Sequence, residues 1–374
     1  MTKMHENTTE FDRAILVGVG VGETITEADL DELSDLCKSC NIIEAGRIIQ
    51  NRKDVDVTYY VGKGKVEEIK TLVENADATC VVFDVELSGS KVRNLEAELG
   101  VAVLDRSKVI LDIFAMRAQS MEGKLQVELA MLKYNLPRLV GSHGLMSKMK
   151  TSVGMRGPGE KQLELDKRKI RDEILALEKR LIKLGESRDL NRKHANKSGK
   201  PRVCLVGYTN SGKSTLLNTL AKADVMAEDK LFATLDPKTA NLYLQGSNEE
   251  GQVMTRQILL TDTVGFINKL PHEFIRAFES TLDEARYADL LLHVVDASNE
   301  HYLQQIRVVD EVLEKIGADT VPQILVLNKV DKLGDVGLKL VKQEFSGNYV
   351  TISAKENTNM EELKWKILTG LNAI

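Results

Sequence analysis

Residues 207–214 have the types and the spacing needed to enclose a phosphate chain. They read Gly-Tyr-Thr-Asn-Ser-Gly-Lys-Ser, which matches the pattern G-x-x-x-x-G-K-[ST] in full. A short apolar run, residues 202–206, precedes them, and Leu216 begins the apolar face of a predicted helix behind them. In a strand, loop and helix of this kind, backbone N–H groups and the helix dipole favour anions. We expect the Lys213 amine to reach the β- and γ-phosphates and the Ser214 hydroxyl to ligate Mg²⁺.

A second motif, D-T-V-G at residues 262–265, follows the predicted strand 257–261. The Asp262 carboxylate would hold Mg²⁺ through water, and the backbone N–H of Gly265 would donate to the γ-phosphate. In the segment F-A-T-L-D, Thr234 is the candidate switch residue that closes over Mg²⁺ in the GTP state. An ordinary loop threonine is the alternative interpretation.

The sequence N-K-V-D at residues 328–331 follows the predicted strand 323–327 and indicates which base is bound. The carboxylate of Asp331 can accept both N1–H and the 2-amino group of guanine. Adenine offers neither donor, so this pairing selects GTP over ATP. Asn328 would steady the base edge and the phosphate loop, and the stem of Lys329 can lie along the purine face.

The last motif, S-A-K at residues 353–355, matches the final loop that contacts guanine in such sites. In this order and spacing, the motifs predict one site for GTP and GDP. The residues expected to contact the nucleotide are Gly207, Tyr208, Thr209, Asn210, Ser211, Gly212, Lys213, Ser214, Thr215, Phe232, Ala233, Thr234, Asp262, Thr263, Val264, Gly265, Asn328, Lys329, Asp331, Ser353, Ala354 and Lys355.

Hydrolysis of the γ-phosphate is expected to depend on Lys213, Thr234 and Gly265. Many GTPases place a water-orienting glutamine directly after D-x-x-G, but this chain has Phe266 there. A phenyl ring cannot orient water, so we predict hydrolysis that is slow alone and faster with a partner or a cation. Asn210 occupies the place where potassium-dependent GTPases carry a cation-ligating asparagine, so K⁺ is a candidate cofactor.

These motifs need a doubly wound α/β domain, which we expect over residues 201–374, with a further strand at 289–295 and a last helix at 360–371. Residues 1–115 alternate apolar and amphipathic runs and predict a separate small α/β domain with a largely parallel sheet. Its expected strands are 14–19, 41–49, 80–83 and 101–104, and its expected helices are 29–40, 65–74 and 91–99.

Residues 116–190 are expected to form an antiparallel helical hairpin, because apolar stripes recur at helical spacing over 119–136 and 160–188. Residues 191–200 are then the linker to the nucleotide domain. The loop between the helices, residues 137–159, is rich in glycine and lacks acidic residues. Such a loop suits contact with a phosphate backbone, and plain disorder is the alternative. The candidate RNA contacts are Arg138, His143, Lys148, Lys150 and Arg156.

The charge distribution agrees with a polyanionic partner. The whole chain has a formal net charge of −5, yet residues 116–200 hold 20 basic and 10 acidic side chains. No apolar run is long enough to cross a membrane and no leader is visible, so we expect a cytoplasmic protein that acts as a monomer. Cys37 and Cys40 form a C-x-x-C without a second pair, which we interpret as ordinary reduced thiols.

Longer motifs outside the nucleotide site carry a family resemblance over nearly the whole chain. They are Y-V-G-K-G-K at 60–65, L-D-R at 104–106, Q-V-E-L-A at 126–130, R-G-P-G-E-K-Q-L-E at 156–164 and F-A-T-L-D-P at 232–237. With them the chain resembles the HflX family of translation-factor-class GTPases. Some members continue into a further C-terminal domain, whereas this sequence stops at Ile374. Contacts made by such an extension are therefore not carried over.

The resemblance implies a ribosome-associated GTPase that binds the large ribosomal subunit and splits stalled or idle 70S ribosomes, particularly under stress. It also implies that the hairpin tip reaches ribosomal RNA near the peptidyl-transferase region. GTP would favour the ribosome-engaged state and hydrolysis would release it. Some members use ATP through the N-terminal domain, where this sequence shows no phosphate loop.

Two alternatives share the same motifs. One is a GTPase in ribosome assembly or RNA processing, and the other is a GTP-dependent switch that binds a protein effector through the hairpin. The basic, acid-free loop favours RNA over protein.

Overall fold

The computed structural model describes residues 12–22, 24–139, 158–196, 199–221, 231–232, 235–248, 250–269, 279–345 and 347–372. Contacts divide the chain into two compact units. The first comprises residues 1–116 and 128–177, and the second residues 117–127 and 178–374.

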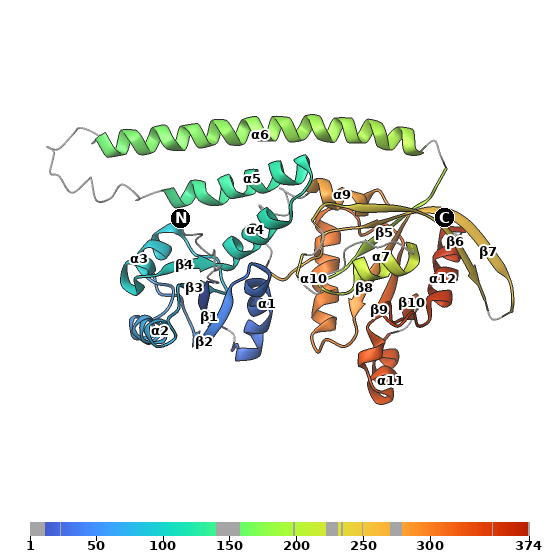
Figure 1. The fold of residues 1–374 in the computed structure, drawn as a ribbon, viewed down its shortest axis with the longest axis horizontal. Helices are drawn as coiled ribbons and strands as arrows, with labels where there is room; N and C mark the ends of the chain where they lie inside the picture. Colours follow the sequence, from blue (N-terminus) through green and yellow to red (C-terminus); the bar gives the residue numbers. More distant parts are fainter. Residues whose placement is uncertain are drawn as a thin grey trace, which may run out of the picture. The chain divides into compact units, whose positions relative to one another are not determined.

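The first unit contains a four-stranded sheet in the order β2-β1-β3-β4, and all of its strand pairs are parallel (Figure 1). Its strands are β1 (Arg13–Val21), β2 (Ile43–Arg52), β3 (Cys80–Phe83) and β4 (Ala102–Asp105). The helices between and after them are η1 (Glu27–Leu30), α1 (Asp31–Ser39), α2 (Lys63–Asn75), α3 (Gly89–Leu99) and α4 (Arg106–Arg117). The predicted small α/β domain is confirmed, with α4 added. The sequence of α4 is apolar on most sides and so lacks helical periodicity.

Helices cover both faces of this sheet. On one face Ile15 and Val17 of β1 pack with Val66 of α2 and Leu95 of α3 in one buried cluster. Successive strand residues point to opposite faces, so the buried Leu16 belongs to the other side. There α1 and α4 meet, and the Cys40 thiol donates to the Val109 carbonyl over 3.4 Å.

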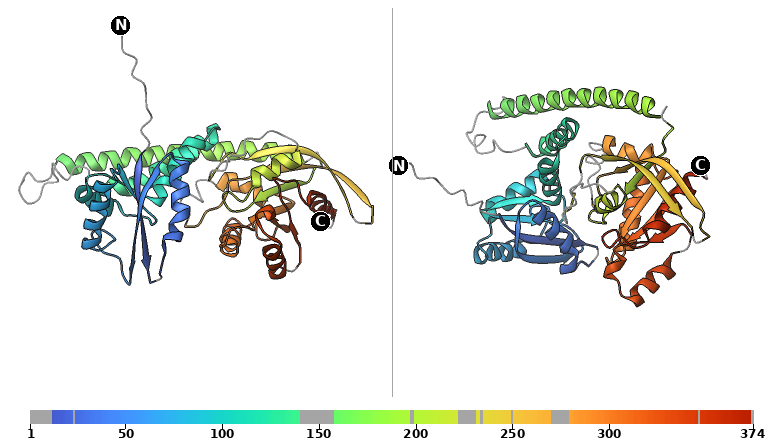
Figure 2. Two further views of the ribbon diagram at one scale, coloured as in Figure 1. Left: turned by 60° about the horizontal axis from the view of Figure 1, so that its bottom comes forward. Right: turned by 45° about the vertical axis from the view of Figure 1, so that its right-hand side comes forward.

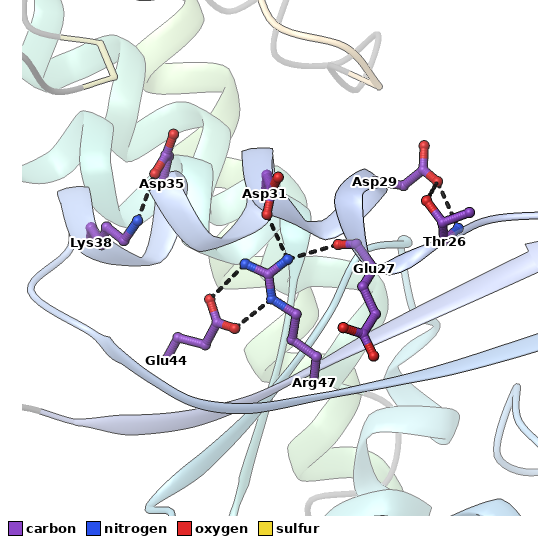
Figure 3. A network of polar contacts seen from close by, with 8 residues as sticks. All are labelled: Thr26, Glu27, Asp29, Asp31, Asp35, Lys38, Glu44 and Arg47. Atoms are coloured by element: carbon purple, nitrogen blue, oxygen red, sulfur yellow. Dashed lines mark hydrogen bonds and ion pairs between the residues drawn. The ribbon is translucent and has the colours of Figure 1, made fainter.

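The edge strand β2 is tied to η1 and α1 through one arginine (Figure 3). The Arg47 guanidinium donates to the Glu44 carboxylate, to Asp31 Oδ1 at 2.6 Å and to the Glu27 carbonyl at 2.7 Å. Contacts with two side chains and a backbone carbonyl fix the orientation of α1 on the sheet. They also raise the pKa of Arg47, first through the hydrogen bond to Glu44.

Burial raises the pKa of the Cys37 and Cys40 thiols, that of Cys40 to about 12. A thiol that stays protonated is a poor nucleophile and a poor metal ligand. Both cysteines are free in the structure, and their burial disfavours the thiolate form.

Arg138 has a structural role that sequence reasoning did not foresee. Its guanidinium donates to Asp105 Oδ2 at 3.0 Å and to the Leu87 carbonyl at 2.7 Å, and it lies 3.5 Å from the centre of the Tyr134 ring. The Asp105 carboxylate, fully buried, also accepts from the Tyr134 hydroxyl at 2.9 Å. Arg138 was predicted to contact RNA; the structure shows its charge engaged within the first unit, and the RNA contact stays a prediction. The other candidates, His143, Lys148, Lys150 and Arg156, lie outside the described residues.

The predicted hairpin helices are present as α5 (Met121–Asn135), which continues into η2 (Leu136–Leu139), and α6 (Pro158–Asn196). Within the first unit, the second half of α5 lies alongside α6 (Figure 1). Leu129 of α5 and Ile174 of α6 are buried, as the apolar stripes predict. The linker predicted at 191–200 is wrong in its first part, because α6 runs on to Asn196. Residues 191–196 contain neither glycine nor proline to end the helix.

The second unit contains a six-stranded sheet in the order β10-β9-β8-β5-β7-β6. Its strands are β5 (Arg202–Val206), β6 (Lys238–Ser247), β7 (Val253–Asp262), β8 (Leu290–Asp296), β9 (Gln323–Asn328) and β10 (Tyr349–Thr351). All pairs are parallel except β6 with β7, which form a long antiparallel ribbon at one edge (Figure 2). This ribbon includes β6, which was not predicted.

The helices of the second unit are α7 (Lys213–Ala221), α9 (Glu279–Arg286), α10 (Tyr302–Lys315), η3 (Val330–Lys332), α11 (Asp335–Glu344) and α12 (Met360–Asn372). Leu217 of α7 and Ile367 of α12 share one buried cluster with the sheet, and Val341 of α11 belongs to a cluster on another part of it. The doubly wound α/β class is confirmed. No helix in the described part of the chain is both long and apolar enough to span a membrane.

Candidate active site

The phosphate loop leaves the carboxyl end of β5 at the point where β8 and β7 flank it. Two of its glycines have no room for a side chain. Gly207 has φ +151°, and an added Cβ would lie 2.1 Å from the Val294 carbonyl oxygen. Gly212 has φ +95°, and a Cβ there would lie 2.2 Å from Asn328 Nδ2. The loop can therefore close tightly against two neighbouring strands only with glycine at both positions.

Lys213 is buried at the start of α7, with its side chain folded back over the loop. Its ammonium donates to the carbonyl oxygens of Gly207 at 3.0 Å and Tyr208 at 2.8 Å. Burial lowers the pKa of Lys213 to about 8; the charge of Lys329 acts in the same direction and that of Asp262 opposes it. A buried ammonium held by two neutral carbonyls is under-compensated, and a polyphosphate would supply the missing negative charge.

The D-T-V-G segment lies directly against this loop. Asp262, fully buried at the end of β7, accepts from the Ser214 hydroxyl at 2.6 Å. The Thr263 hydroxyl donates to the Leu205 carbonyl at 2.7 Å, which holds the segment beside β5. A Cβ added at Gly265 would lie 3.0 Å from Lys213 Nζ. The structure thus brings together the phosphate lysine, the hydroxyl and carboxylate predicted for Mg²⁺, and the glycine predicted for the γ-phosphate.

The residue after the glycine is buried beside the phosphate loop. Phe266 is 2% exposed, and its backbone pairs with the phosphate loop. Its N–H donates to the Gly207 carbonyl at 3.1 Å, and its carbonyl accepts from the Thr209 N–H at 2.7 Å. A phenyl ring carries no group that donates a hydrogen bond to water or accepts one from it, so which group orients the attacking water stays a prediction.

The guanine motif is organised by one asparagine. Asn328 Nδ2 donates to the Ser211 carbonyl at 2.9 Å, and its Oδ1 accepts from the Ala354 N–H at 3.0 Å. Asn328 therefore links the phosphate loop to the S-A-K loop. Asp331 accepts from the Ser353 hydroxyl at 2.6 Å, and its carboxylate remains exposed to meet a base.

Lys329 has a left-handed backbone, with φ +64°. Its ammonium donates to the Asn210 carbonyl at 2.7 Å and pairs with Asp296 Oδ2 at 2.8 Å. These two contacts hold the Lys329 side chain between the phosphate loop and the end of β8. Sequence reasoning missed Asp296, which ends strand β8; the signal available was an acidic residue at the carboxyl end of a parallel strand.

Some predicted residues are not placed as expected. The Phe232 side chain is 2% exposed, so contact with a nucleotide would have to come from its backbone. Lys355 extends into solvent, with its side chain 80% exposed. Ala233 and Thr234 lie outside the described residues. Of the remaining predicted contacts, Thr209 and Ser211 have buried hydroxyls with no hydrogen-bond partner among the described residues.

Comparisons with known proteins agree with this geometry. Three family models match in order: GTP-binding GTPase N-terminal at residues 27–115, GTP-binding GTPase Middle Region at 117–195, and 50S ribosome-binding GTPase at 202–329. A crystal structure of a complex of SsGBP and GDP has a TM-score of 0.51 and 28% identity, and the match covers 96% of this chain and 99% of that one.

Curated relatives match this chain over most of its length. GTPase HflX of Caldanaerobacter subterraneus subsp. tengcongensis is 46% identical over 362 residues, which cover 96% of this chain and 81% of the relative. GTPase HflX of Escherichia coli K12 is 40% identical over 353 residues, which cover 94% and 81%. Fold and site define a P-loop protein that binds GTP and GDP and hydrolyses GTP. The chain belongs to the HflX family of GTPases, as the sequence motifs indicated.

Proposed function

We propose that this chain binds the large ribosomal subunit in its GTP-bound state and separates 70S ribosomes into subunits. The observation that carries the proposal is the exposed basic face of the long helix α6 in a chain that also contains a GTPase site. Family likeness supports it, since one matching model is described as a 50S ribosome-binding GTPase.

The basic face of α6 follows from helical spacing. At 100° per residue, three exposed cations fall within an arc of about 100° in the part of α6 that belongs to the second unit. They are Lys179, Arg180 and Lys183, and no acidic side chain of residues 178–186 lies on that arc. Ile182, which is 62% exposed, lies on the turn beside it. Cations with interspersed apolar groups suit RNA backbone together with ribosomal protein or base surfaces.

Mg²⁺ fits the donor set at the phosphate loop. The Ser214 hydroxyl and the Asp262 carboxylate are hard oxygen donors 2.6 Å apart, beside the lysine expected to bind phosphate. We propose that these two residues hold the ion, with Thr234 as the switch residue that closes over it. When bound, Mg²⁺ would neutralise charge on the β- and γ-phosphate oxygens.

Hydrolysis would be slow without a partner, because Phe266 is buried and apolar. Lys213 would orient the γ-phosphate, and the Gly265 N–H would donate to it. We propose that ribosome binding supplies the group that orients the attacking water. Asn210 is exposed on the phosphate loop and is a candidate K⁺ ligand. Equal hydrolysis rates in sodium and potassium chloride would rule out that role.

The test is sedimentation of the purified protein with 70S ribosomes in sucrose gradients, with a non-hydrolysable GTP analogue or GDP. We expect free subunits, with the protein on the large subunit, in the analogue alone. Binding to the large subunit without dissociation of 70S particles would favour ribosome assembly. Protein that remains at the top of the gradient with both nucleotides would exclude the ribosome as the partner.

A pair of variants tests the basic face. The first changes Lys179, Arg180 and Lys183 to alanine. The matched control changes three other exposed cations of the same unit, Lys315, Lys339 and Lys342, to alanine. Only the first should weaken ribosome binding and flatten its salt dependence, while both retain GTP affinity. Equal effects of the two variants would refute a specific role for α6.

A further inference from the structure

Asp236, two residues after Thr234 in the chain, contacts the beginning of helix α5. Its Oδ2 accepts from the backbone N–H groups of Gln119 at 3.0 Å and Ser120 at 2.8 Å. Its Oδ1 accepts from the Ser120 hydroxyl. All of these residues belong to the second unit. One carboxylate from the segment beside the nucleotide site therefore binds three donors at a helix N-terminus.

The first turn of α5 is built to receive this carboxylate. The Ser120 hydroxyl oxygen also accepts from the Gly123 N–H at 2.9 Å, which makes Ser120 the N-cap of α5. Gly123 is buried, and a Cβ added there would lie 2.6 Å from Asp236 Oδ1. A larger residue at 123 would push the carboxylate away. The negative charge of Asp236 also suits the positive end of the helix dipole.

We propose that Asp236 is a positioning residue for GTP hydrolysis and that its receptor, Gln119, Ser120 and Gly123, is part of the hydrolytic machinery. The contact anchors Asp236, two residues after Thr234 in the chain, to the N-terminus of α5, and the action of the switch threonine in hydrolysis depends on this anchor. The inference rests on the role proposed above for Thr234. It does not depend on the ribosome.

The contact makes nucleotide state and the start of α5 mutually dependent. A nucleotide that favours the Asp236 contact stabilises the first turn of α5, and by reciprocity a partner that stabilises that turn favours the contact. The amides of Gln119 and Ser120 are the direct reporters, because each donates its hydrogen bond to Asp236. Their exchange with deuterated solvent should slow when a non-hydrolysable GTP analogue replaces GDP.

Three variants test the contact by different routes: Asp236→Asn, Ser120→Ala and Gly123→Ala. Each should lower kcat of the intact protein about tenfold and leave KM and GDP affinity within about twofold, because GDP does not need the switch. The double variant that combines Asp236→Asn with Ser120→Ala should have a kcat no lower than that of either single variant, because both substitutions remove the same contact. Ser120→Thr keeps the hydroxyl cap and should retain most of the activity.

Gly185→Ala is the matched control for Gly123→Ala. Both glycines lie in helices, but nothing lies within 4 Å of a Cβ added at Gly185. Its kcat should be unchanged, and circular dichroism should show every variant folded. Thr234→Ala tests the role of Thr234 in hydrolysis separately from the positioning role of Asp236. If it leaves kcat unchanged, the role of Thr234 is wrong. If it lowers kcat while the three contact variants do not, or if they raise kcat, the positioning role of Asp236 is wrong.

Discussion

The titration of Lys213 makes nucleotide affinity depend on pH in a predictable direction. Burial lowers the pKa of Lys213 to about 8 in the nucleotide-free protein, against an ordinary value of 10.5. The phosphates of GTP or GDP favour the charged amine, so its pKa rises on binding and a proton is taken up. The protonated form binds, and affinity must fall as pH rises through 8.

The magnitude follows from the pKa. About a tenth of Lys213 is neutral at pH 7 and about nine tenths at pH 9, so affinity should fall about tenfold between these values. At pH 8 about half a proton should be taken up per nucleotide bound. Stability of the free protein should change in the opposite direction. The unfolded chain binds more protons between pH 8 and 10.5, so the free energy of unfolding rises across that window.

Isothermal titration calorimetry of GDP in two buffers of different ionisation enthalpy measures the proton uptake directly. Guanine N1–H also titrates at alkaline pH and weakens its bond to Asp331. Lys213→Arg separates the contributions of Lys213 and of guanine N1–H to the pH dependence, because arginine stays charged and only the guanine contribution remains. No proton uptake at pH 8, or the same pH slope in Lys213→Arg as in the native protein, would refute the reasoning.

Further predictions concern specificity and stability. Asp331→Asn should weaken GTP binding at least about a hundredfold and improve the binding of xanthosine nucleotides. Competition with a fluorescent GDP measures both affinities. Unchanged GTP affinity would exclude Asp331 as the guanine acceptor. Arg138→Ala leaves the fully buried Asp105 carboxylate uncompensated and should cost about 3–5 kcal/mol, whereas Arg168→Ala on exposed α6 should shift the thermal midpoint little. Burial, with the charge of Lys213, lowers the pKa of His293 to about 4. The unfolded chain then binds more protons between about pH 6.5 and 4, so about 3 kcal/mol of stability should be lost as pH falls through that window. Denaturant titrations should show the loss, and His293→Gln should remove it; an unchanged pH slope in that variant would contradict the assignment.

The nucleotide site could be predicted from sequence because each of its motifs is local. The phosphate loop needs Gly207 and Gly212 where backbone and neighbours leave no space, and its lysine and serine lie next to each other in the chain. Each motif follows a strand, and parallel strands bring their carboxyl ends to one edge of the sheet. Order and spacing alone therefore indicated that Ser214, Asp262 and Asn328 would converge.

Periodicity predicted most helices and strands for the same reason, since one face of each element is apolar. It gave no prediction for α4 (Arg106–Arg117), which is apolar on most sides, nor for β6, α9, α10 and α11, and it missed the end of α6, where nothing in residues 191–196 stops a helix. For α4 and the end of α6 no local signal marks the boundary.

Only the tertiary structure decided which charged groups meet across long stretches of chain. Arg138 looks like a free cation in a basic loop, yet the fold places Asp105 and the Leu87 carbonyl around it. Asp236 looks like part of a switch motif, yet it caps a helix more than a hundred residues earlier in the chain. Sequence spacing determines which residues a strand, loop or helix presents. The packing of distant elements determines which of those residues are neutralised, buried or left to bind a ligand.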